Sequence, residues 1–97
     1  MNTTQTPYSL FEGNTGGFLI AELPEMQVAL PYFGLRQMKH HARPELIILQ
    51  FAELNVEVHG RSLGQLFESL AIMRVRRIGV GTGDKGFKID KIEVLEG

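Results

Sequence analysis

The stretch ELIILQFAELNVEVHGRSLGQLFESLAIM, residues 45–73, contains the patterns that decide the fold. Its first part, 45–51, is apolar on both faces, and we expect a central strand buried on both sides. Residues 52–55 are a plausible turn. In 56–60 two valines alternate with a glutamate and a histidine. This alternation predicts a hairpin whose second strand has one buried and one solvent-facing side.

The end of the same stretch, residues 62–73, predicts an amphipathic helix. Ser62 is a typical N-cap residue, and Gln65 three positions later completes a capping box. A strand could not place the apolar residues that follow on one side, but a helix does. They are Leu63, Leu66, Phe67, Leu70 and Met73.

Shorter strand patterns lie on both sides of this stretch, and prolines or glycines separate them. In the last of them the apolar set changes phase between Asp90 and Lys91, which predicts a β-bulge there. The patterns cover residues 17–23, 26–30, 32–42, 74–80 and 87–95.

The segment GVGTGDKG, residues 79–86, has the glycine spacing of a dinucleotide-binding loop. Such a loop works because it leads into a helix whose N-terminus receives the phosphates. Here the strand-like residues Phe87, Lys88 and Ile89 follow instead. We therefore interpret the segment as a hairpin turn, with positive φ angles supplied by its glycines. These are Gly79, Gly81, Gly83 and Gly86.

Together the patterns predict an α+β, mostly β fold. We expect a strongly bent antiparallel sheet, or a small SH3/Sm-like barrel, of five to seven strands with one amphipathic helix at about 62–73. Residues 17–97 are predicted to form a single globular domain. Residues 1–16 are rich in Thr, Asn and Gly, and predict a flexible or loosely docked arm.

Two features of this fold favour self-association. A small sheet has edge strands, and residues 18–23, FLIAEL, are largely uncharged, so we expect them to be satisfied in a homo-oligomer. Tyr8, Leu10 and Phe11 could pin the arm to the body of the protein or to a neighbouring subunit.

Composition narrows the function classes. The 97 residues contain no cysteine, which excludes disulfides, thiolate metal sites and cysteine nucleophiles. The N-terminus lacks the pattern of a signal peptide, and the longest apolar runs, such as 46–49, are far too short to cross a membrane. We therefore expect a cytoplasmic protein with no membrane partner.

The net charge of −1 argues against a strong general affinity for nucleic acid. Residues 61–91, however, contain seven basic and three acidic side chains, a net +4, which leaves −5 for the rest. If the fold gathers these cations, they could contact phosphates. Otherwise they form a solvated face that protects strand edges. The candidate anion or nucleic-acid contacts are Arg61, Arg74, Arg76, Arg77, Lys85 and Lys88.

A second basic region is more ambiguous. Tyr32 and Phe33 lie beside Arg36 and Lys39, a mixture of aromatic and basic residues that single-strand binders also use. The low aromatic content favours core packing for both rings.

Residues that could bind metal or catalyse a reaction are few. His40 and His41 point to opposite faces of an extended chain and cannot chelate one ion together. A site that combines one of them with His59 and Glu57 is conceivable, but the spacing is not that of a metal motif. No pair of carboxylates or activated serine stands out. We therefore predict no metal, no cofactor, no catalytic residue and no enzyme activity.

Residues 56–78, VEVHGRSLGQLFESLAIMRVRRI, resemble small bacterial proteins of uncharacterised function that have V-x-V-x-G-x-x-L-x-x-L before an apolar helix. Proteins of this size with short bent strands also look like Sm-like small barrels. That resemblance implies ring-shaped homo-oligomers and RNA binding.

Three functional hypotheses follow. The first is a non-catalytic interaction or assembly module that acts as a homo-oligomer. The alternative is an RNA-binding protein that uses a basic face. The third is a small-molecule or metal-binding domain with its site between helix and sheet.

Overall fold

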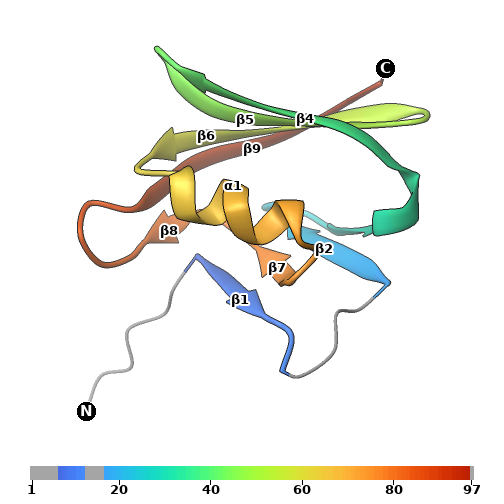
Figure 1. Cartoon of the computed structure of the whole chain (residues 1–97), viewed down its shortest axis with the longest axis horizontal. Helices are drawn as coiled ribbons and strands as arrows, with labels where there is room; N and C mark the ends of the chain where they lie inside the picture. The colour runs from blue at the N-terminus through green and yellow to red at the C-terminus, as the bar shows by residue number, and fades with distance from the viewer. Residues whose placement is uncertain (1–6, 13–16, 97) are drawn as a thin grey trace.

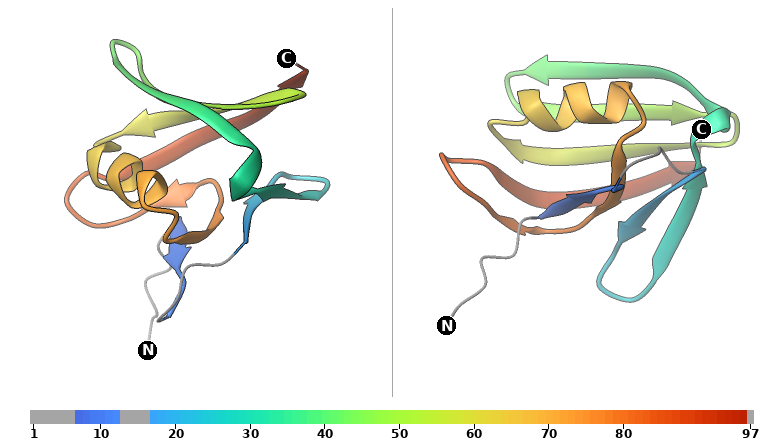
Figure 2. Two further views of the ribbon diagram at one scale, coloured as in Figure 1. Left: turned by 45° about the vertical axis from the view of Figure 1, so that its right-hand side comes forward. Right: turned by 60° about the horizontal axis from the view of Figure 1, so that its bottom comes forward.

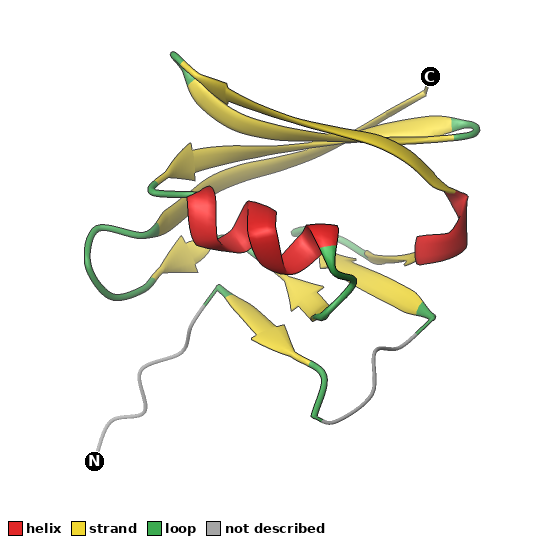
Figure 3. Cartoon of the chain, viewed as in Figure 1, coloured by secondary structure: helices red, strands yellow, loops and turns green. Residues whose placement is uncertain are grey.

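The computed structural model describes residues 7–12 and 17–96. Strands dominate this part of the chain, and one α-helix lies beside them (Figure 3). The predicted mostly β, α+β class is therefore confirmed. The barrel is not confirmed, because the described strands form two sheets, of five and four strands, and no closed barrel. The predicted number of strands, five to seven, is too low for the same reason.

The five-stranded sheet is antiparallel throughout, with strand order β4-β5-β6-β9-β8 (Figure 1). Hairpins join β4 to β5 and β5 to β6, and the second of them is the hairpin that the alternation in residues 45–60 predicts. Its strands are β4 (Leu35–Ala42), β5 (Glu45–Phe51), β6 (Leu54–Arg61), β8 (Gly81–Thr82) and β9 (Lys88–Glu96).

The four-stranded sheet has the order β1-β7-β2-β3, and its β2–β7 pair is parallel. Because β2 lies between β3 and β7, the expectation that residues 18–23 form an exposed edge is wrong. Among the described strands, the edge of the sheet beside β2 is β3. The strands are β1 (Tyr8–Leu10), β2 (Phe18–Glu22), β3 (Gln27–Pro31) and β7 (Val75–Ile78).

Strand β1 joins part of the predicted arm to the body of the protein. It pairs antiparallel with β7, and the Phe11 amide donates to the Arg74 carbonyl at 2.9 Å. The Tyr8 ring meets the Phe87 ring edge-on, with centroids 5.2 Å apart. Residues 1–6 and 13–16 of the predicted arm lie outside the described residues.

Helix α1 (Gly64–Ala71) lies across the opening between the two sheets, where it contacts β4 of one sheet and β7 of the other (Figure 2). Leu63, Leu66 and Leu70 are completely buried in the core, as the apolar stripe predicts. Met73 follows the helix with a φ of 60° and is 43% exposed. The stripe therefore ends one turn earlier than expected.

The N-terminus of α1 is capped by a side chain from strand β5. The Glu45 carboxylate on β5 accepts hydrogen bonds from the amides of Ser62 and Leu63, both at 2.8 Å. The N-cap position is Leu63, Ser62 has a φ of 55°, and no side chain of the helix segment itself makes a cap bond. The predicted Ser62–Gln65 capping box is therefore wrong.

The second half of the glycine-rich segment forms the predicted hairpin turn, between Thr82 and Lys88, whereas Gly81 and Thr82 form strand β8. The Gly83 amide donates to the Phe87 carbonyl at 2.8 Å. Positive φ angles occur at Lys85 and Gly86, so the expectation that all four glycines need them is wrong. At Gly83 the reason for glycine is space, because a Cβ would lie 2.9 Å from the Phe87 ring.

The predicted bulge in the last strand is confirmed. His59 on β6 pairs with Lys91, whereas the next residue, Gly60, pairs with Ile89, so Asp90 is the extra residue. The extra residue resets the alternation, and both Ile89 and Ile92 face the core.

Tyr32, in the short helical turn η1 (Tyr32–Gly34), ties β3 to the core. Its side chain is buried, and the hydroxyl donates to the Val75 carbonyl on β7 at 2.6 Å. We expect Tyr32→Phe to lower the free energy of unfolding by about 1–1.5 kcal/mol, because the buried carbonyl loses this donor. Urea denaturation measures the change. Tyr32→Leu, which also removes ring packing, should cost more, and an unchanged midpoint for Tyr32→Phe would contradict the assigned bond.

Candidate functional site

The predicted cations are distributed over three parts of the fold. Arg61 and Lys88 are direct cross-strand neighbours on β6 and β9. Lys85 lies in the β8–β9 turn, and the three arginines lie on β7 or immediately before it.

Several of these cations already have partners. Arg77 forms an ion pair with Glu22 at 2.9 Å, and Lys88 with Asp90 at 3.1 Å. A guanidinium nitrogen of Arg74 donates to the Phe11 carbonyl at 3.5 Å. Arg61, Arg76 and Lys85 are exposed. The structure therefore brings only Arg61 and Lys88 together as neighbours on adjacent strands. Arg74 and Arg77 instead contact other residues of the same chain.

The histidines separate as the sequence predicts. His40 and His41 are consecutive on extended β4 and point to opposite faces of the sheet. The His40 ring stacks on Phe67 of the helix, with centroids 5.4 Å apart, and its Nε2 is 2.9 Å from a Glu45 oxygen. His40 thus supports the helix cap.

The same cap limits what the helix N-terminus can bind. The Glu45 carboxylate accepts the amides of Ser62 and Leu63, immediately before the first helical residue, and its negative charge disfavours a second anion at this helix end. Beside it is an open depression of about 580 Å³. Its lining includes Tyr8, Ser62, Gln65, Asp84, Lys85 and Phe87, but neither His40 nor His59. The expected histidine-lined site between helix and sheet is therefore not this depression.

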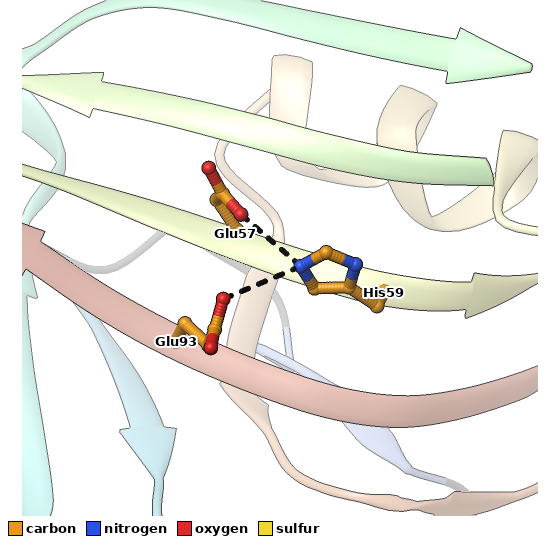
Figure 4. Close-up of side chains that lie close together, drawn as sticks. All are labelled: Glu57, His59 and Glu93. Atoms are coloured by element: carbon orange, nitrogen blue, oxygen red, sulfur yellow. Dashed lines mark hydrogen bonds and ion pairs between the residues drawn. The ribbon is translucent and has the colours of Figure 1, made fainter. Parts of the chain in front are cut away.

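A cluster of three polar side chains, Glu57, His59 and Glu93, lies on the outer face of the five-stranded sheet, opposite the core (Figure 4). Nε2 of His59 lies 3.1 Å from a Glu57 carboxylate oxygen and 3.7 Å from one of Glu93. The three side chains are partly buried, at 26%, 26% and 40% relative exposure for His59, Glu57 and Glu93. Among the described residues, these three side chains form a group that could hold a metal ion.

Strand β3 is the third candidate, because no other described strand pairs with its outer edge. The Leu23 amide bonds to the Met26 carbonyl and the Tyr32 amide to the Gly17 carbonyl, both at 2.8 Å, at the two ends of the β2–β3 ladder. Hydrogen-bonded and non-bonded pairs alternate along an antiparallel ladder. The odd-numbered residues of β3 therefore direct their backbone N–H and C=O groups away from β2.

Exposed apolar side chains lie near the two ends of β3 and on the neighbouring strand β2. Phe33, immediately after β3, is 88% exposed, Met26 before it is 58% exposed, and Phe18 opposite Pro31 is 51% exposed. The expectation that Phe33 packs in the core is wrong, whereas Tyr32 is a core residue.

Sequence reasoning missed Glu45, Glu93 and the β3 edge. The Glu57-x-His59 spacing does place both side chains on one face of a strand. Glu93 and Glu45 join their partners only through strand pairing and the position of the helix, which no local pattern reveals. The lack of charge in residues 27–31 was a usable signal for an edge, and Pro31 was a second one.

No family model matches this chain, and neither a curated protein nor a solved structure shows significant similarity to it. No helix in the described part of the chain is long and apolar enough to span a membrane.

Proposed function

We propose that this protein is a non-catalytic interaction module that assembles with copies of itself through β3. The observation that carries the proposal is an uncharged strand, QVALP, whose outer edge pairs with no other described strand and which has exposed Phe18, Met26 and Phe33 near it. Unpaired strand edges are templates for pairing with another chain, and exposed apolar side chains add area to such a contact.

A second copy fits this edge antiparallel, about a twofold axis at Ala29. Ala29 then exchanges both backbone hydrogen bonds with Ala29 of the second copy, and the Gln27 amide donates to the second copy's Pro31 carbonyl. Pro31 has no N–H to contribute, which is why proline is tolerated at an edge. No side chain of β3 brings like charges together across the axis.

The other described edges fit a second copy less well. Strand β4 has Arg36, Lys39, His40 and His41 along its length, and basic edge strands resist pairing with themselves. Strands β1 and β8 have three and two residues, too few for a stable ladder. The β3 edge is therefore where we place the contact.

Charge at Ala29 tests the proposal. Light scattering coupled to size exclusion is expected to give a dimer for the natural chain and a monomer for Ala29→Lys at the same micromolar concentration. Two lysines opposite each other on the axis have Cβ atoms about 5 Å apart. At a similar separation of their ammonium groups, the repulsion costs about 1–3 kcal/mol, which weakens dimerisation about 5- to 150-fold. Because Ala29 is solvent-exposed, the substitution leaves the fold intact.

Two controls separate the edge from general charge effects. Ala71→Lys, on the exposed side of the helix, should leave the dimer unchanged. Mixing the Ala29→Lys chain with an Ala29→Glu chain should restore a dimer, because opposite charges then meet. A natural chain that is strictly monomeric at micromolar concentration, or an Ala29→Lys chain that remains dimeric, overturns the proposal.

Nucleic-acid binding is supported less well, because Arg77 and Lys88 are paired with carboxylates. The adjacent pair Arg61 and Lys88 is the feature that keeps it as an alternative. Titration of labelled single-stranded RNA at increasing salt distinguishes the two functions, since phosphate contacts weaken as salt rises.

A further inference from the structure

The cluster of Glu57, His59 and Glu93 lies on a different sheet from β3, so an inference from it is independent of the proposed assembly. Glu57 and His59 are two residues apart on β6 and point to the same side. Glu93 lies directly opposite Glu57 on the neighbouring strand β9. Figure 4 shows the two carboxylates on either side of the imidazole Nε2.

The donor atoms are close to the spacing that one ion requires. One ligand atom from each side chain lies within 4.8 Å of the other two. Ligands at about 2.0–2.2 Å from a metal are separated by roughly 3–3.6 Å. The two distances from Nε2, 3.1 and 3.7 Å, are near that range, and the carboxylates are exposed enough to rotate closer together.

The pairing of the two glutamates indicates that a cation belongs between them. Like charges directly opposite on adjacent antiparallel strands are destabilising, yet β6 and β9 place Glu57 and Glu93 in this position. The Lys91 ammonium lies 3.5 Å from one Glu93 oxygen, and the other oxygen faces His59. A metal ion bound to the Nε2 lone pair would place positive charge between the two carboxylates.

We propose that Glu57, His59 and Glu93 form a binding site for a divalent first-row transition metal ion, represented by Zn²⁺. One imidazole and two carboxylates suit Zn²⁺, whereas Mg²⁺ and Ca²⁺ prefer oxygen ligands alone. Three protein ligands on a solvent-facing sheet leave coordination positions for water or for a donor from another molecule. On the β5 side of the cluster, Leu46 and Ile48 are the direct cross-strand neighbours of His59 and Glu57.

Isothermal titration calorimetry with ZnCl₂ at pH 7.5 tests the site. The natural chain is expected to bind one ion per chain, with much weaker binding of Mg²⁺. His59→Ala should lower the Zn²⁺ affinity at least about tenfold, since loss of even an outer partner of a metal ligand has that effect. His41→Ala is the matched control, because it removes an exposed imidazole from the same face of the sheet. Its affinity should equal that of the natural chain.

Thermal unfolding supplies a second readout, and it uses a variant of Glu93 in place of one of His59. Zn²⁺ at about a hundredfold above its dissociation constant should raise the Tm of the natural chain by roughly 10 °C. Glu93→Gln keeps the size of the side chain, and its Tm without metal checks that it folds. Its Tm should respond much less to Zn²⁺. The proposal is overturned if the natural chain does not bind Zn²⁺ at millimolar concentration, or if His59→Ala binds it as tightly as the natural chain. It is also overturned if His41→Ala lowers the Zn²⁺ affinity as much as His59→Ala does.

Discussion

Gly60→Ala is expected to lower the free energy of unfolding by about 3 kcal/mol, the upper part of the range for overpacking. A Cβ at Gly60 would collide with the backbone carbonyl oxygen of Lys88, at the place where β6 passes the bulge of β9. A flexible side chain could turn away, but a carbonyl oxygen moves only if the two strands separate. Urea denaturation followed by circular dichroism measures the loss.

Gly64→Ala is the control for this substitution. Gly64 is the first residue of α1, and no described atom outside its own helix turn lies within 4 Å of the position of its Cβ. Alanine there should raise the free energy of unfolding by about 0.5 kcal/mol, because it restricts the unfolded chain and favours the helix. The same chemical change thus has opposite signs at two glycines four residues apart. Similar stabilities for both variants would contradict the close approach of β6 and β9 at Gly60.

Local periodicity was sufficient to predict the elements whose apolar residues all lie on one face. The leucines of α1 are three or four residues apart, and the structure buries Leu63, Leu66 and Leu70 completely. The phase change at Asp90 predicted the bulge, because one extra residue is needed to keep the apolar side chains before and after it on the same face of the sheet. The strand-like residues after Gly86 identified the glycine segment as a turn.

Features that depend on distant residues could not be predicted in this way. β2 has the composition of an edge strand, but β7 returns beside it in parallel after the helix and makes it central. Ser62 has the ideal chemistry for a cap, yet the chain reaches the helix with Ser62 at a positive φ, and Glu45 takes the cap position instead. Glu93 joins His59 only through the register of β6 and β9.

The second large effect is expected at Glu45, which connects β5, β4 and the helix. Burial alone would raise the pKa of the Glu45 carboxyl group, but hydrogen bonds outweigh it and lower the pKa from its ordinary value. The donors are the Leu63 amide, the His40 imidazole and the Ser62 amide. Hydrogen bonds to a charged group contribute about 1.5–3 kcal/mol each. Glu45→Gln keeps the shape of the side chain and removes the charge, so it should cost about 2 kcal/mol at pH 7.

The pH dependence of this cost distinguishes the charge from the shape of the side chain. A carboxyl group with a lowered folded-state pKa stabilises the protein fully above its unfolded-state pKa, near 4.5, and loses this contribution as the pH falls through the folded value. The difference between Glu45→Gln and the natural chain should therefore be largest above about pH 6 and shrink towards pH 3. Denaturant midpoints at pH 7, 5 and 3 measure it. Glu53→Gln, at the exposed β5–β6 turn, is the control and should leave the midpoint unchanged at all three. A difference for Glu45→Gln that stays constant with pH would contradict a charged cap, because only the ionised carboxylate outperforms an amide as the acceptor for these donors.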